Sequence, residues 1–221
     1  MALVSICAHP DDKVRESIAS IFHLSVNSGA ILAIFPCMKA LSIDDSSVVR
    51  KAALRNIGKL NYKAPKHISD DIYGVLVASW KNELSTDVKS ACLHSLKNFS
   101  YSSEPYGRRK EISAIVAEAI GDENREIVKS ATWIIGGLSF GFKPTDEFND
   151  KILEELLIAY KIDRDIPRSW YIQAFENLRG ELPDWAEANL IRDKDLERQD
   201  RIERIKMEQY MRQREREESE K

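Results

Sequence analysis

Apolar residues recur along most of the chain at the three- and four-residue intervals that place side chains on one face of an α-helix. Val49, Ala53 and Ile57 belong to one such series, and Val88 and Cys92 belong to another. Short runs of Asp, Ser, Thr or Asn precede these series. Such residues accept hydrogen bonds from the free N–H groups at the start of a helix. The pattern therefore predicts an all-α protein built from amphipathic helices.

The helical series are copies of one another. Each copy has a polar turn, an apolar anchor, a nearby basic residue and a small residue one turn later. The anchors are Val14, Val49, Val88, Val128 and Ile166. Their spacings are 35, 39, 40 and 38 residues, the length of a unit with two helices and short turns. The other helix of each unit is predicted at residues 2–8, 29–41, 68–84, 108–120 and 148–162.

This pattern resembles the HEAT-repeat, armadillo-like α-solenoids, with an Asp turn, a Val-Arg helix start and a proline (Pro36) that should kink a first helix. The resemblance covers roughly residues 1–180. It implies a right-handed α-α superhelix of about five helix pairs, with the second helices on the concave side. Two features depart from it: the basic residue of the fifth copy is shifted to Arg168, and Gly136-Gly137 interrupts a second helix. The glycine pair predicts a close helix approach or a local break.

The composition changes near residue 190, so we predict a solenoid at 1–190 and a charged tail at 191–221. The tail contains 10 basic and 10 acidic residues. Pairs such as Glu197 and Arg201 support a solvated helix. We therefore expect an exposed or frayed helix, with disorder and partner-induced order as alternatives. The apolar residues of the tail do not follow the heptad of a coiled coil: Leu196, Ile202, Ile205 and Met211.

The first predicted helix, residues 2–8, is apolar at nearly every position. Terminal repeats of a solenoid normally carry a polar cap, because no further repeat covers their outer face. We therefore expect this end to be either a cut through a longer array or a docking face for a partner or another copy. Leu3, Val4 and Ile6 are the residues predicted to form that face.

The amino-acid composition disfavours two classes of protein, membrane proteins and nucleic-acid-binding domains. A hydrophobic fraction of 43%, a charged fraction of 31% and a mean hydropathy of −0.39 disfavour a membrane protein. The net charge of −3 lacks the basic excess typical of nucleic-acid-binding domains. Cys7, Cys37 and Cys92 lie far apart among apolar residues, so we predict separate buried thiols in a reducing compartment and a cytoplasmic protein.

Two sets of basic residues are candidate binding residues. The residues beside the anchors could form a ladder for an acidic ligand, but the neighbouring acidic turns favour ion pairs between repeats: Arg15, Arg50, Lys89, Lys129 and Arg168. The second set is predicted to face the concave groove and to meet an acidic peptide or a phosphate backbone. An ordinary solvated face is the alternative. This second set is Lys51, Arg55, Lys59, His94 and Lys97, and the same helical positions in the fourth copy are Ser130 and Ile134.

Core packing is the expected role of Trp80, Trp133 and Trp170. The four histidines are scattered, and no Cys-x-x-Cys, His-Glu pair or Walker loop occurs, so we expect no metal, no cofactor and no enzymatic activity. The predicted function is a protein–protein interaction scaffold in a larger assembly or longer array, with a protein partner that presents acidic residues and no membrane partner. The alternative is a nucleic-acid-binding module similar to the HEAT-like DNA glycosylases, using the same basic groove.

Overall fold

The computed structural model describes residues 6–22, 28–99, 106–136, 144–162, 165–178 and 180–219. The predicted helix pairs of repeats two to five are confirmed within these ranges, whereas the helix predicted at residues 2–8 lies mostly outside them. The second helices of the repeats are α2 (Asp12–Ile21), α4 (Ser47–Leu60), α6 (Thr86–Leu96), α8 (Arg125–Gly136) and α10 (Arg168–Asn177). The first helices of repeats two to five are α3 (Ser28–Leu41), α5 (Lys66–Asn82), α7 (Tyr106–Ile120) and α9 (Asp146–Ile162). Short 3-10 turns follow two second helices, η1 (Asn61–Lys63) and η2 (Lys97–Phe99), and α11 (Asp184–Ser219) completes the described chain.

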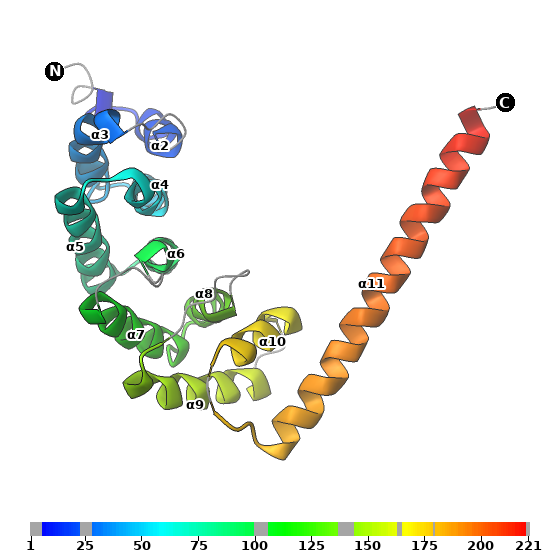
Figure 1. Ribbon diagram of the computed structural model, residues 1–221. Helices are drawn as coiled ribbons and strands as arrows, with labels where there is room; N and C mark the ends of the chain where they lie inside the picture. The colour runs from blue at the N-terminus through cyan, green and yellow to red at the C-terminus, as the bar shows by residue number, and fades with distance from the viewer. Residues whose placement is uncertain are drawn as a thin grey trace.

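The helix pairs stack into an arc. Figure 1 shows α3, α5, α7 and α9 along its outer side, and α2, α4, α6, α8 and α10 along its inner side. The second helices therefore line the concave face, as predicted. Pro36 lies inside α3, also as predicted.

A continuous apolar core joins the repeats. The anchors Val49 and Val88 are fully buried, as are Ile57 and Leu96 on the same two helices. Trp80 of α5 is 1% exposed, which confirms its predicted core role. Each described first helix packs on its own second helix and on a neighbouring repeat, so the described repeats bury their apolar faces against one another.

Neighbouring second helices approach so closely that side chains would separate them. A Cβ atom added to Gly58 of α4 would lie 2.7 Å from the Cβ of Ser95 on α6. One added to Gly136 of α8 would lie 2.7 Å from the carbonyl oxygen of Trp170 on α10. The Ser95 hydroxyl also donates a 2.5 Å hydrogen bond to the carbonyl of Leu54. The close approach predicted for the glycine pair is therefore confirmed at Gly136, whereas Gly137 lies outside the described residues.

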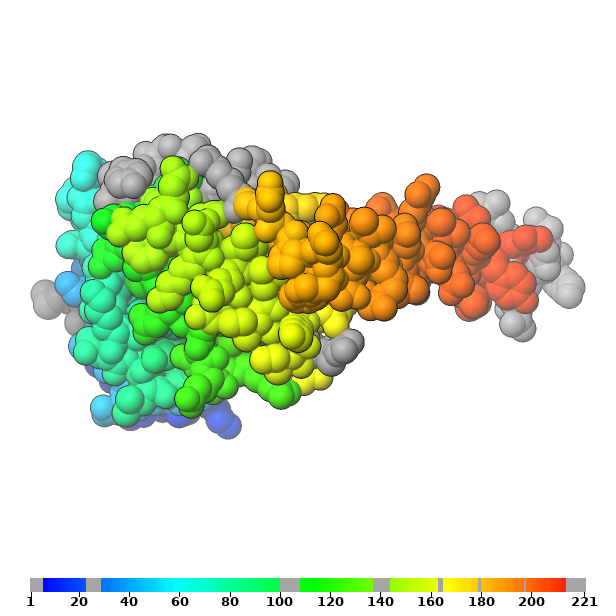
Figure 2. Space-filling model, turned by 90° about the horizontal axis from the view of Figure 1, so that it is seen from below, coloured from blue at the N-terminus to red at the C-terminus, as the bar shows by residue number. Residues whose placement is uncertain are grey.

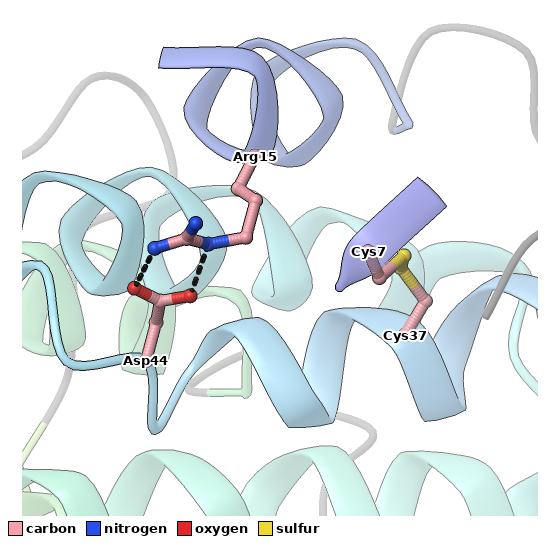
Figure 3. The surroundings of a disulfide bond; sticks show 4 residues. All are labelled: Cys7, Arg15, Cys37 and Asp44. Atoms are coloured by element: carbon pink, nitrogen blue, oxygen red, sulfur yellow. Dashed lines mark hydrogen bonds and ion pairs between the residues drawn. A yellow bond between two sulfur atoms is a disulfide. The ribbon is translucent and has the colours of Figure 1, made fainter. Parts of the chain in front are cut away.

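The basic residues beside the first two anchors form ion pairs between repeats, as the acidic turns suggested. The Arg15 guanidinium binds the Asp44 carboxylate with Nε–Oδ2 and Nη2–Oδ1 distances of 2.7 and 2.9 Å (Figure 3). Arg50 binds Glu83 in the same way at 2.8 and 3.0 Å. Each arginine, through its hydrogen bonds, lowers the pKa of its carboxyl partner. Arg15 and Arg50 therefore hold successive repeats together, and their charges are not part of a ladder for an acidic ligand.

The first and second cysteines form a disulfide, so the prediction of separate thiols was wrong for this pair. Figure 3 shows Cys7 joined to Cys37 of α3. The two residues are 30 positions apart in sequence, but stacking of the first repeat on α3 brings their Cα atoms to 5.9 Å. Cys92 is a buried free thiol, and burial raises its pKa to about 12. The predicted reducing compartment relied on unpaired cysteines and loses that support.

Thiol counting tests this pairing. Alkylation of the unfolded, unreduced protein should label Cys92 alone, because a disulfide sulfur is not alkylated. Reduction before alkylation should raise the count to all three cysteines, as measured by the mass of the intact protein. Three labels without reductant would contradict the disulfide.

Helix α11 has a packed beginning and an exposed remainder. Ala186, Leu190 and Asp193 are buried against the last repeat. Ile202 and Tyr210 are 44% and 60% exposed, and Figure 2 shows this helix projecting from the body of the arc. The prediction of an exposed helical tail is confirmed in the described residues. The helix begins at Asp184, however, before the boundary predicted at residue 191.

No helix in the described part of the chain is both long and apolar enough to span a bilayer.

Candidate functional site

Four of the five predicted groove residues lie close together on the concave face. Arg55 and Lys59 are one turn apart on α4. His94 lies near the end of α6, and Lys97 begins η2 immediately after that helix. Since α4 and α6 pack closely, the two pairs face one another, and Arg55 acts electrostatically on both Lys59 and His94.

Trp133 of α8 completes this cluster. Its ring stacks on the His94 ring with the centroids 4.4 Å apart, and the Lys97 ammonium lies 4.2 Å from the centroid of the Trp133 ring. A cation over an indole face contributes about 0.5–2 kcal/mol. We call Arg55, Lys59, His94, Lys97 and Trp133 the concave cluster; it spans three successive second helices.

Trp133 both packs against the core and reaches the concave cluster, and its size is the reason. Leu54 and Leu93 occupy the equivalent position five residues after their anchors, and both are fully buried. An indole is larger than a leucine side chain, so Trp133 packs against the core and is only partly buried. Core packing, its predicted role, is therefore correct but incomplete. Two other repeats have leucine at this position, so the tryptophan was the sequence signal that this residue could also reach the concave surface.

The register on α8 differs from the prediction. Ser130 and Ile134 were expected on the concave surface, but they are only 6% and 1% exposed. The Ser130 hydroxyl meets the Ser90 hydroxyl of α6 at 2.6 Å. Contact between α6 and α8 thus covers this face of α8, and Trp133 is the α8 residue that reaches the cluster.

Lys51 lies one turn before Arg55 on α4, and its charge is already paired. Its ammonium forms a 2.8 Å ion pair with Asp87 of α6. Lys51 and Arg55 line a hollow of about 280 Å³ together with Glu16 of α2. Arg55 is exposed and has no ion pair in the described part of the chain. It is the residue of the cluster best placed to meet an acidic group.

Partial burial weakens the hydration of the cluster's cationic and titratable groups. Burial lowers the pKa of Lys97. Burial and the nearby Arg55 charge lower the pKa of Lys59. The largest effect is on His94, where burial, followed by Arg55 and Lys97, lowers the pKa to about 4. His94 is therefore neutral near pH 7 and serves as a ring surface, while the arginine and the lysines carry the positive charge.

The His94 pKa predicts a loss of stability in acid. Its usual pKa is about 6.5, so the unfolded chain binds a proton first and stability falls as the pH drops from 6.5 towards 4. We expect this residue alone to remove about 2 kcal/mol between pH 7 and 4. Chemical denaturation of the wild type and a His94→Phe variant at both pH values measures the difference. NMR titration should identify a histidine signal near pH 4 that this variant lacks; titration near 6.5 would contradict the assignment.

The predicted N-terminal face is only partly within the described residues. Ile6 is 45% exposed, and Leu3 and Val4 lie outside the described ranges. A docking role for these three residues therefore stays a prediction. In the described part of the chain, no three His, Cys, Asp or Glu side chains are grouped closely enough to hold a metal ion.

The sequence matches no family model and none of the curated proteins. Solved structures match it well in shape. A designed armadillo repeat protein in complex with the peptide (KR)4 has a TM-score of 0.53 and 17% identity, covering 80% of each chain. The fold is an armadillo-like helical solenoid. Computationally designed armadillo repeat proteins for modular peptide recognition give a TM-score of 0.51 at 15% identity, covering 80% of this chain and 81% of theirs. An engineered protein from a structural genomics programme gives 0.52 at 18%, with coverage of 80% and 77%.

Proposed function

We propose that this protein is a non-enzymatic scaffold whose concave face binds an acidic segment of a partner protein. The observation that carries the proposal is the concave cluster, in which the Lys97 ammonium lies over the ring of the partly buried Trp133 and Arg55 acts electrostatically on Lys59. Clustered cations attract carboxylates, and a partly exposed indole provides a surface for an apolar or aromatic side chain. A segment that alternates acidic and aromatic residues satisfies both.

The position of the cluster suits an extended peptide. Its residues come from α4, α6 and α8, so a bound segment would cross three repeats along the inner side of the arc in Figure 1. The partial burial of Lys97 reduces solvent screening of its charge. One designed structural neighbour is in complex with a basic peptide. The positive concave cluster of the present chain favours a ligand of the opposite charge.

Binding assays with defined probes test the proposal. A fluorescein-labelled (Glu-Tyr)4 peptide should bind the wild type, and Arg55→Glu should weaken that binding at least about tenfold. Lys151→Glu is the matched control, because Lys151 is exposed on α9 and away from the cluster. Equal binding of (Glu-Tyr)4 to the wild type and to Arg55→Glu would contradict the proposal.

A nucleic-acid ligand is the competing explanation, since cations beside a stacking ring also suit single-stranded DNA or RNA. Labelled oligo-dT distinguishes the two in the same assay. Oligo-dT that binds more tightly than (Glu-Tyr)4, with a steep loss of affinity as salt increases, would favour the nucleic acid. The acidic overall charge of −3 argues for the peptide.

A further inference from the structure

A second groove lies between α3 and α5, two helices on the outer side of the arc in Figure 1. Its volume is about 860 Å³. Gly74, Val75 and Ala78 of α5 contribute its small-residue lining, and Ile43 and Leu84, in the turns that follow α3 and α5, also line it. We call this site the outer groove. It shares no residue with the concave cluster and, apart from Arg50 of α4, is lined by first helices and the turns that follow them.

Gly74 is a helix residue with no structural need to be glycine. It lies in the middle of α5, where glycine is less favourable than alanine. A Cβ atom added there would meet nothing within 4 Å, in contrast to Gly58 and Gly136, whose neighbours leave no space. No close approach among the described residues accounts for Gly74. Close approach of another molecule would.

The outer groove also exposes large apolar side chains. Leu84 is 95% exposed and Ile43 is 78% exposed. Gly74, Ala78 and Asn82 follow one another at four-residue intervals along α5, and all three are exposed. A ridge of small residues with this spacing lets a second helix lie close to the first. Ile43 and Leu84 can then contact its apolar side chains.

The charge of the groove determines which helix fits. Five carboxylates and two cations line it: Asp44, Asp45, Asp70, Asp71, Glu83, Lys39 and Arg50. Arg15, Arg50 and Arg108 already bind Asp44, Glu83 and Asp70, respectively. Asp45 and Asp71 have no ion pair in the part of the chain that the structure describes. The groove therefore has acidic groups available to a cationic partner.

We propose that the outer groove binds a basic amphipathic helix of a partner protein. The apolar side of that helix lies over Gly74 and Ala78 and contacts Ile43 and Leu84. Its lysines or arginines pair with Asp45 and Asp71. The concave cluster would then bind an acidic ligand and the outer groove a basic one. Binding in the outer groove does not depend on a ligand at the concave cluster.

A designed helix tests this inference. The probe is an 18-residue fluorescent peptide with leucine on one helical face, lysine elsewhere and a central photo-crosslinking residue. The wild type should bind it and form cross-links within residues 39–45 and 70–84. A peptide with the same composition in scrambled order, and one with glutamate in place of lysine, should both bind at least about tenfold more weakly.

Two variants locate the binding. Gly74→Phe fills the groove from a position with open space, and Asp45→Lys with Asp71→Lys reverses its available charges. Each should weaken binding at least about tenfold, with circular dichroism unchanged. Glu154→Lys, on the exposed surface of α9, is the matched control and should bind like the wild type.

Three results would overturn the inference. They are absence of probe binding at about 1 mM, wild-type affinity in both groove variants, and cross-links that lie in the concave cluster or α11. Sedimentation of the free chain tests a different occupant. A dimer that dissociates in Gly74→Phe would assign the groove to a second copy of the chain and not to a basic helix.

Discussion

Gly58→Ala is expected to lower the free energy of unfolding by about 2 kcal/mol, and Gly74→Ala is expected to raise it by about 0.5–1 kcal/mol. The chemical change is the same at both sites, a methyl group in the middle of a helix. At Gly58 the new Cβ atom lies 2.7 Å from the Ser95 Cβ and 2.9 Å from the Ser95 carbonyl oxygen. Those atoms belong to or adjoin the backbone of α6, so the two helices must separate. At Gly74 the new Cβ atom meets no described atom within 4 Å beyond the neighbouring backbone of its own helix, and only the gain in helix propensity remains.

Urea denaturation of the two variants and the wild type measures both effects. Separation of α4 from α6 also moves Arg55 and Lys59 away from His94 and Lys97, so Gly58→Ala should weaken binding of the (Glu-Tyr)4 probe as well. Gly74→Ala should leave binding of that probe unchanged. A stabilising effect at both glycines would show that α4 and α6 are not in the close contact described.

Asp193→Ala should lower the free energy of unfolding by about 2–4 kcal/mol, because it leaves the buried Tyr160 hydroxyl unpaired and removes the carboxylate beside the partly buried Arg168. The Asp193 side chain is 8% exposed, and it accepts a 2.6 Å hydrogen bond from the Tyr160 hydroxyl. Its carboxylate also lies 3.7 Å from Nε of Arg168. Burial, together with the Asp193 hydrogen bond, raises the pKa of Tyr160 to about 12. These contacts attach the start of α11 to the fifth repeat.

Asp195→Ala is the matched control, since Asp195 is exposed two residues further along the same helix. We expect it to change stability by less than about 0.5 kcal/mol. Hydrogen exchange adds a local test: Asp193→Ala should increase exchange in residues 184–195, while α4 and α6 stay protected. Equal stability of the two variants would mean that Asp193 does not hold α11 to the solenoid.

Asp193 also explains why the basic residue of the fifth repeat is shifted to Arg168. Asp44 and Glu83 accept an arginine from the second helix of the preceding repeat. Asp193 accepts Arg168 in a comparable way, although it lies on α11 and not in a turn. The beginning of α11 thus covers the last repeat as a further first helix would. Composition placed the tail boundary later, because the packed and exposed parts of α11 are both rich in charge.

Local pattern alone was sufficient to predict the helix pairs and their length, and the resemblance to HEAT-repeat solenoids implied the inner position of the second helices. Periodicity and helix caps depend on residues within a few positions of one another, and these are readable in order along the chain. The same information predicted that Arg15 and Arg50 would pair with acidic turns. It also brought Arg55, Lys59, His94 and Lys97 into one candidate groove, although binding there is still a proposal.

Only the tertiary structure decided which repeats touch, and at which atoms. The Cys7–Cys37 disulfide, the Trp133 ring beside His94 and Lys97, and the pairing of Asp193 with Arg168 each join residues about 25–40 positions apart. Such contacts depend on how far each helix is rotated and shifted against its neighbour. A repeat sequence defines the helices that stack, but that rotation and shift come from side-chain packing between repeats, which no local pattern encodes.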